Sequence, residues 1–248
     1  MGLKRLAATD TLSAASCGKG NAVGENKTVG IIGGMGPLAA AEFFRRLILA
    51  TPASCDQEHL HILVDNDPSV PDRIAAILRD GPDPGPRMIA MAVRLEAAGA
   101  EVLAMPCNTG HVFLERIRDA VSVPVLDMPG ETANAIDVRS VGLLATTGTI
   151  ETGLFHRACE QRGIGLLTPD ASDQELVMKA IHWIKASGEL EGPQAWITGV
   201  ANRLHARGAE AVIAGCTEIS LLSGDALSIR WVDALDHLVR ATLCEALG

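Results

Sequence analysis

The stretch RLEAAGAEVLAMPC, residues 94–107, recurs as RLHARGAEAVIAGC at residues 203–216. In both copies the pattern Arg-Leu-x-Ala-x-Gly-Ala-Glu leads into an apolar run that ends in a cysteine, Cys107 or Cys216. The strand opening VGII at residues 29–32 likewise resembles VGLL at residues 141–144. An internal repeat of this kind predicts two similar halves related by a pseudo-twofold axis.

Strands and helices alternate along the chain on either side of this repeat. Apolar runs predict strands at residues 28–32, 61–64, 102–105, 123–126, 141–145 and 211–214. Amphipathic stretches predict helices at residues 38–50 (after Pro37), 86–98, 149–161, 174–186, 193–207 and 233–246. Such alternation indicates an α/β fold with mostly parallel sheets, here two Rossmann-like three-layer subdomains.

The repeat also predicts the domain organisation. We expect residues 28–128 plus 233–248 to form one subdomain, residues 129–232 the other, and residues 1–27 a mobile extension. Ligands of open α/β sheets bind at the carboxyl ends of strands, where Cys107 and Cys216 both stand. The two thiols should therefore face each other across one cleft between the subdomains.

Composition limits the possible partners. The chain has 248 residues, 48% of them apolar and 21% charged, with a net charge of −9. An acidic surface of this kind disfavours nucleic acid and anionic membranes as partners. No apolar run reaches the ~20 residues that span a bilayer, and no signal-peptide core is visible before Cys17. Six scattered cysteines are typical of a reduced, cytoplasmic protein and not of a disulfide framework.

The two repeat-matched cysteines are the best candidates for chemistry. Each precedes a predicted helix, the first starting near His111, and a helix N-terminus favours the thiolate by lowering the pKa of a thiol. Removing the α-proton of an amino acid needs a base on one face of Cα and an acid on the other, which one thiolate and one thiol can supply. We interpret Cys17, Cys55, Cys159 and Cys244 as ordinary buried cysteines.

Three other interpretations of these motifs are weaker. Cys107, His111 and Cys216 could bind a metal, but no Cys-x-x-Cys or further ligand at suitable spacing supports this. The two thiols could instead form a redox disulfide. The loop Gly34-x-Gly36-x-x-Ala39 fits a loose dinucleotide motif, yet the acidic residue that should follow about 20 positions later is missing, since Asp65 comes too late. We therefore expect no cofactor.

The glycine loop and its counterpart in the second half favour carboxylate binding through helix-terminal N–H groups. We expect them to contribute Met35, Gly36, Thr146 and Thr149 to the substrate site, and Cys216 to be joined there by its neighbours Thr217 and Glu218. Arg73, in the polar loop at residues 65–73, could clamp a carboxylate with two hydrogen bonds. From the residues alone, Arg73 and Lys185 could equally be surface side chains.

Five motifs together resemble the aspartate/glutamate racemase superfamily, in particular its aspartate racemase branch: GGMGP at residues 33–37, PDR at 71–73, PCNTGH at 106–111, LATTGT at 144–149 and GCTEI at 215–219. The resemblance runs from about Val29 to the C-terminus. It implies a homodimeric racemase that needs no pyridoxal phosphate and uses Cys107 and Cys216 as its acid–base pair.

The same resemblance assigns further roles. It implies that Arg73 and Lys185 bind the side-chain carboxylate, and that Asn108 and Thr109 contact the substrate backbone. Glu218 stands where glutamate racemases of cell-wall synthesis usually carry histidine. Gly110 departs from the family, which more often has a side chain there. The sequence therefore predicts an aspartate or glutamate racemase. The alternatives are a related maleate or hydantoin isomerase, and a non-catalytic amino-acid-binding protein.

Overall fold

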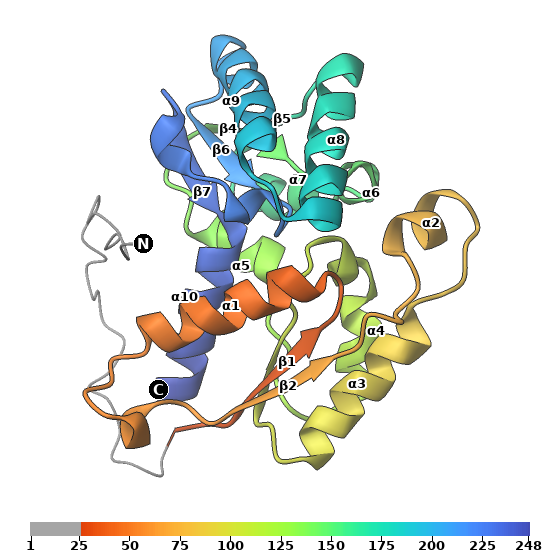
Figure 1. The fold of residues 1–248 in the computed structure, drawn as a ribbon, viewed down its shortest axis with the longest axis vertical. Coiled ribbons are helices and arrows are strands. Elements are labelled where there is room, and N and C mark those ends of the chain that lie inside the picture. Colours follow the sequence, from red (N-terminus) through yellow and green to blue (C-terminus); the bar gives the residue numbers. More distant parts are fainter. Residues whose placement is uncertain (1–25) are drawn as a thin grey trace.

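The computed structural model describes residues 26–248, which form two parallel β-sheets with helices between them and outside them (Figure 1). The first sheet has the strand order β2-β1-β3 and the second β5-β4-β6-β7. All strand pairs are parallel. The predicted α/β fold with parallel sheets in two subdomains is confirmed.

The first sheet is built around β1 (Val29–Gly33), which is buried along its whole length. It lies between β2 (Ile62–Asn66) and β3 (Val102–Ala104). The strand predicted at residues 123–126 is wrong as an extended element, because only Val125 pairs, through an isolated parallel bridge to Leu103. Pro124 has no N–H to donate, which limits the ladder there.

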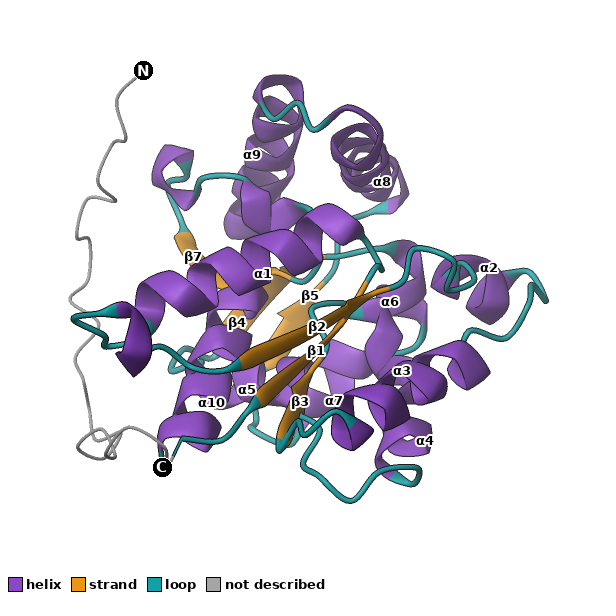
Figure 2. Cartoon of the chain, turned by 60° about the horizontal axis from the view of Figure 1, so that its bottom comes forward, coloured by secondary structure: helices purple, strands orange, loops and turns teal. Residues whose placement is uncertain are grey.

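Helices cover both faces of the first sheet (Figure 2). The helices of this half are α1 (Pro37–Ala50), α2 (Arg73–Leu78), α3 (Gly85–Ala97) and α4 (Leu114–Arg118), with 3-10 turns at Asp56–Glu58 and Thr109–Phe113. The sequence placed Arg73 at the end of a polar loop and predicted no helix at α2. Asp72 caps this helix, since its Oδ1 accepts a hydrogen bond from the N–H of Ala75 at 2.6 Å, and the apolar residues that follow sustain the turn.

The second sheet repeats the order of the first around β4 (Ser140–Leu144). Its neighbours are β5 (Gly165–Leu167) and β6 (Ala211–Ala214), and β7 (Arg230–Asp233) pairs with β6. β5 and β7 were not predicted, because neither is a fully apolar, buried run: β5 starts with the exposed Gly165 and β7 with the exposed Arg230. Within the first sheet Val125 occupies the position that β7 has in the second.

The helices that follow in the chain are α5 (Met128–Asn134), α6 (Thr147–Glu151), α7 (Leu154–Glu160), α8 (Ala171–Ser187) and α9 (Glu191–Ala206), with 3-10 turns at Ile219–Leu221 and Gly224–Ala226, and the chain ends with α10 (Ala234–Leu247). The single helix predicted at residues 149–161 is wrong. Gly153 has a φ of 67°, a left-handed conformation that ends α6 before α7 begins.

One hydrophobic core joins the two sheets. Ile31 of β1 and Ile213 of β6 belong to the same buried cluster, together with Leu235 and Leu238 of α10. Two further clusters lie outside the sheets, one under α3 and α4 and the other under α8 and α9. Because α10 contacts α1 and β3 as well as α5, the last helix packs against the first half. This packing supports the domain boundaries at residues 128 and 232, which stay a prediction.

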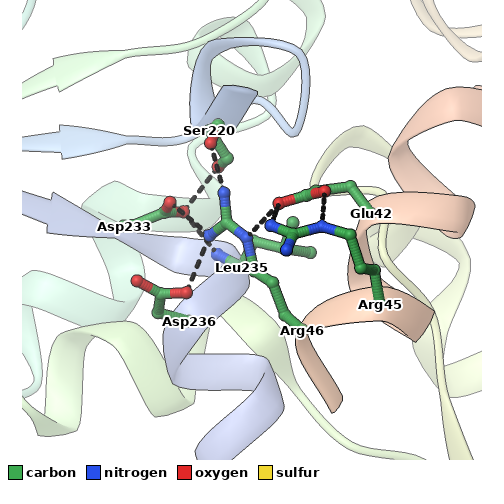
Figure 3. Close-up of polar contacts among 7 residues, drawn as sticks. All are labelled: Glu42, Arg45, Arg46, Ser220, Asp233, Leu235 and Asp236. Atoms are coloured by element: carbon green, nitrogen blue, oxygen red, sulfur yellow. Dashed lines mark hydrogen bonds and ion pairs between the residues drawn. The ribbon is translucent and has the colours of Figure 1, made fainter. Parts of the chain in front are cut away.

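A network of charges also connects the halves, as Figure 3 shows. Arg46 of α1 donates to Asp233 at 2.6 Å, to Asp236 at 2.7 Å and to Glu42 at 2.8 Å, and it also donates to the backbone carbonyl of Ser220. Ser220 lies four residues after Cys216. Arg46 therefore fixes the loop of the second cysteine to the first helix.

The remaining cysteines and the N-terminal residues differ in part from expectation. Cys159 is buried as predicted, whereas Cys55 and Cys244 are exposed. Cys17 and most of the predicted extension at residues 1–27 lie outside the described residues. Lys27 is described, and its N–H donates to the carbonyl of Ala246 at 2.9 Å. No helix within residues 26–248 is both long and apolar enough to cross a membrane.

Candidate active site

A small pocket lies between the halves, at the carboxyl ends of the central strands. Ten of the twelve residues predicted for the site line it, namely Met35, Arg73, Cys107, Asn108, Thr109, Thr146, Lys185, Cys216, Thr217 and Glu218. Asp72 and Ile74 also line it and were not predicted. Their signal was present in the sequence, because both adjoin Arg73. Gly36 and Thr149, the two others, lie immediately behind the lining.

Cys107 follows β3, and its side chain is buried at 6% exposure. The helix predicted to start near His111 begins as the 3-10 turn Thr109–Phe113, which leads directly into α4 at Leu114. His111 supports this turn. The N–H of Met128 donates to Nε2 of His111 at 3.1 Å, so Nδ1 carries the proton and donates to the carbonyl of Cys107 at 2.9 Å. Burial lowers the pKa of His111, which keeps the ring neutral.

Cys216 follows β6 and is equally buried, at 6% exposure. Its thiol donates to Oε2 of Glu218 at 3.0 Å, and Oε1 of Glu218 lies 3.6 Å from Nζ of Lys185. Burial raises the pKa of the Cys216 thiol well above its ordinary value, and the Glu218 carboxylate raises it further. The expected lowering of this pKa by a helix N-terminus is therefore wrong. Only a short 3-10 turn follows, and a carboxylate is nearer than any helix dipole.

Arg73 is the first residue of α2 and is buried at 9% exposure, so it is not a solvated loop arginine. Nη1 donates to the carbonyl of Pro71 at 3.1 Å and Nη2 to that of Met35 at 3.1 Å. Nε is buried and has no partner. Nη2 carries a second hydrogen, so one edge of the guanidinium remains available to a carboxylate.

Asn108, like Arg73, has buried polar atoms without a hydrogen-bond partner. It is only 3% exposed, and neither Oδ1 nor Nδ2 has a hydrogen-bond partner. Because buried polar groups are nearly always hydrogen-bonded, such atoms at the wall of a pocket indicate a ligand that supplies the missing partners. Asn108 and Arg73 together offer donors and one acceptor to that ligand.

Three threonines join the two halves beside the pocket. Oγ1 of Thr109 lies 2.9 Å from Oγ1 of Thr146 and 2.9 Å from Oγ1 of Thr149. Thr146 also caps α6, since its Oγ1 accepts from the N–H of Thr149 at 3.1 Å. Thr149 is fully buried behind Thr146, so it supports the site and does not line it.

The glycine loop reaches the pocket from the other side. A Cβ added to Gly36 would lie 3.2 Å from Oε1 of Glu218. The missing side chain therefore lets the start of α1 approach the carboxylate that contacts Cys216. Thr217, at 2% exposure, lies between Cys216 and Glu218 in the loop that follows β6.

The metal and nucleotide interpretations gain no support from these contacts. Both ring nitrogens of His111 contact backbone groups, so this side chain does not face the thiols as a ligand would. Within residues 26–248, no group of three or more His, Cys, Asp or Glu side chains is arranged to hold a metal ion. Asp65 pairs with Arg94 at 2.7 Å instead of facing the glycine loop.

Known proteins resemble the chain over nearly its whole length. The aspartate racemase of Picrophilus torridus is 31% identical and superposes with a TM-score of 0.81, covering 89% of this chain and 94% of that one. The broad specificity amino-acid racemase RacX of Bacillus subtilis is 28% identical over 229 residues, which span 89% of this chain and 98% of the relative. A glutamate racemase of Francisella tularensis, 17% identical with a TM-score of 0.63 over 88% of this chain and 80% of its own, shares the fold.

The family model of Asp/Glu/hydantoin racemases matches residues 32–242, which include both cysteine loops, the glycine loop and α2. The chain therefore belongs to the Asp/Glu/hydantoin racemase family of isomerases.

Proposed function

We propose that the chain is a cofactor-independent racemase that interconverts L- and D-aspartate, L- and D-glutamate, or both. Cys107 and Cys216 would be its acid–base pair. The observation that carries the proposal is one pocket lined by both repeat-matched thiols and by two buried side chains, Arg73 and Asn108, with unsatisfied polar atoms.

The proposed reaction uses the two thiols as its only acid and base. A thiolate on one face of Cα takes the α-proton, and the electron pair of the broken C–H bond delocalises into the α-carboxylate. The thiol on the other face then delivers its proton to Cα. Hydrogen bonds to the α-carboxylate would stabilise the charge that develops there, and we assign this role to Asn108 and Thr109, which line the pocket.

The charges of the pocket favour an acidic amino acid. Arg73 and Lys185 are cationic and Glu218 is anionic, so these three side chains can pair with the two carboxylates and the ammonium of an acidic amino acid. Burial is the largest single effect and acts to lower the pKa of Lys185. The negative charges of Glu218 and of the two cysteines together outweigh it and raise that pKa, which keeps the ammonium charged. Asp72 stands at the exposed rim, where solvent screens its charge.

Glu218 also separates this proposal from the maleate isomerase alternative. A dicarboxylate without an ammonium would place a second negative charge near Glu218 with no cation of its own to compensate it. Glu218 and Oδ1 of Asn108 are instead suitable acceptors for an α-ammonium. A binding protein without catalysis would not need two thiols at equivalent strand ends. The homodimeric state implied by the family resemblance and the cytoplasmic location expected from the scattered cysteines complete the proposal.

Exchange of the α-proton in deuterated water tests the proposal. The purified chain, without added pyridoxal phosphate or metal, is incubated with each enantiomer of aspartate and glutamate, and with lysine and alanine as non-acidic controls. We expect deuterium at Cα and loss of optical activity for at least one acidic pair, and much slower exchange for the controls. Exchange only with the non-acidic amino acids would refute the acidic substrate. No exchange with any of them, or an absolute need for pyridoxal phosphate, would refute the two-thiol racemase.

A further inference from the structure

The two thiols of the pocket have different partners. Cys216 donates to the carboxylate of Glu218 at 3.0 Å. Within residues 26–248, no side-chain carboxylate makes a hydrogen bond to the thiol of Cys107, whose loop is supported by the neutral His111 through a backbone carbonyl. The two cysteines therefore occupy equivalent positions in the repeat, but their thiols have different hydrogen-bond partners.

The position of Glu218 makes its effect on Cys216 strong. Its side chain is only 5% exposed, so little solvent screens the carboxylate. Hydrogen bonding to a carboxylate requires the protonated thiol, whereas a thiolate 3.0 Å from the same oxygen would meet like charge at close range. The cation that opposes this effect is Lys185 of α8, 3.6 Å from the other carboxylate oxygen, and the second cation that lines the pocket is Arg73 of α2.

We propose that Glu218 is a positioning residue that holds the proton on Cys216 in the substrate-free enzyme. This makes Cys216 the acid and Cys107 the base of the first proton transfer. The inference rests on the proposed racemase function and assigns the two thiols unequal starting states. Burial and the Glu218 carboxylate both raise the pKa of Cys216, which agrees with this assignment.

Glu218 also affects the form of the enzyme that one turnover leaves behind. The Cys107 thiolate forms an S–H bond as the Cα–H bond breaks, and the Cys216 S–H bond then breaks as its proton joins the opposite face of Cα. Turnover thus leaves a thiol at Cys107 and a thiolate at Cys216. That thiolate faces Glu218, so this form of the enzyme is the less stable one. It returns to the starting form when Cys216 takes a proton from solvent and Cys107 releases one.

Reactivity of each thiol toward iodoacetamide measures this asymmetry, because only the thiolate is alkylated. Peptide mass spectrometry of the substrate-free chain, over a series of pH values, gives a separate labelling midpoint for Cys107 and for Cys216. We expect Cys216 to be labelled only at higher pH than Cys107. Glu218→Gln should lower the Cys216 midpoint by about one pH unit or more, which is about tenfold faster labelling below the midpoint. Glu115→Gln, at a side chain that is 78% exposed, is the matched control and should change neither midpoint.

A second variant tests the same electrostatics in the opposite direction. Lys185→Met removes the cation beside Glu218 and should raise the Cys216 midpoint, which also keeps the proposal testable if Glu218→Gln does not fold. Equal midpoints for the two thiols in the native chain, or a Cys216 midpoint that neither variant moves, would overturn the proposal. Labelling does not depend on turnover. A chain that shows the expected midpoints but exchanges no α-proton would refute the racemase function and leave the proton on Cys216 assigned to Glu218.

Discussion

The loops that carry the two cysteines begin alike and are held in place by different chemistry. After β3, the neutral ring of His111 connects the carbonyl of Cys107 to the N–H of Met128. After β6, the backbone carbonyl of Ser220 is held by Arg46, and its hydroxyl donates to Asp233 at 2.5 Å. The repeat therefore sets where each cysteine stands, while unrelated contacts fix its loop. One loop depends on uncharged hydrogen bonds and the other on a partly buried ion network.

The largest effect should come from the thiols themselves. Cys107→Ser and Cys216→Ser should each lower racemisation by at least about 10²–10⁴-fold, because a serine hydroxyl is far less acidic than a thiol. Each variant retains the thiol on one face of Cα, so each should exchange the α-proton of one enantiomer with deuterated water, and the two should select opposite enantiomers. Proton NMR at Cα measures this. Cys159→Ser, at a buried cysteine outside the pocket, is the control.

Two outcomes would contradict the prediction that the two thiols act on opposite faces of Cα. Full racemisation by either serine variant would show that one thiol is dispensable. Exchange of the same enantiomer by both variants would show that the thiols do not serve opposite faces of Cα, whatever the symmetry of the sheets.

The anchor of the second loop should have the next largest effect. Arg46→Met leaves the buried carboxylate of Asp233 without its cation, and we expect a loss of about 2–4 kcal/mol in the free energy of unfolding, measured by urea denaturation. The methionine retains most of the apolar length of the side chain. Asp233→Asn combined with Arg46→Met should recover part of the loss, because no uncompensated charge remains.

The loss should also depend on pH. Burial raises the pKa of Asp233 to about 6, and Arg46 is the cation that limits the rise. Without Arg46 this pKa rises further above its unfolded value of about 3.9. A carboxyl group whose pKa is raised by folding stabilises the fold at low pH, and that stability is lost as the pH increases through the folded-state pKa. Arg46→Met should therefore be closest to the native chain near about pH 5 and least stable above about pH 7. A deficit that is constant over this range would rule out Asp233 as its cause.

The two cations of the pocket differ in how they can bind a substrate carboxylate. Arg73 offers the unpartnered Nε edge of its guanidinium, whereas Lys185 offers a single ammonium. Arg73→Lys should remove the paired hydrogen bonds to a carboxylate and reduce kcat/KM for acidic substrates by about 1.5–3 kcal/mol, roughly ten- to a hundredfold. Arg79→Lys, at the exposed end of the same helix, is the control. Unchanged kinetics in Arg73→Lys would leave Arg73 with only its backbone contacts.

Periodicity and spacing could predict the parts of this molecule that repeat. The strands at residues 29–33 and 140–144, the helix that starts at Pro37 and the meeting of both cysteines at one pocket follow from apolar runs and from the offset of the two copies. β5 and β7 were missed because they lack the continuous apolar run that revealed the equally short β3 and β6. Gly153 ends a helix through a backbone angle that a glycine permits but does not require.

The sequence predicted which residues line the site better than it predicted how their charges interact. Spacing brought Cys216 and Glu218 into the list of site residues, but it could not show that the carboxylate lies 3.0 Å from the thiol. Sequence reasoning therefore assigned a helix dipole where burial and a like charge act instead. In the same way, Arg73 changed from an uncertain loop residue to a buried one because Asp72 starts a helix that apolar periodicity over six residues does not reveal.

The smallest effect tests whether equivalent glycines of the two repeat copies contribute equally to the free energy of unfolding. Gly99 follows α3 with a φ of 100°, and its counterpart Gly208 follows α9 with a φ of 102°. A Cβ at either position would meet no atom within 4 Å, so an alanine there changes the backbone energy and little else. Gly99→Ala and Gly208→Ala should each lower the free energy of unfolding by about 1 kcal/mol, because an L-residue is strained at positive φ. Gly192→Ala, inside α9 and with its nearest atom 3.8 Å away, should leave stability unchanged or raise it. Urea denaturation of the three variants decides the matter. Equal losses at Gly99 and Gly208 would mean that the two halves share their helix-to-strand turns and differ only in what anchors their cysteines. Unequal losses would show that the difference between the halves begins before the cysteines are reached.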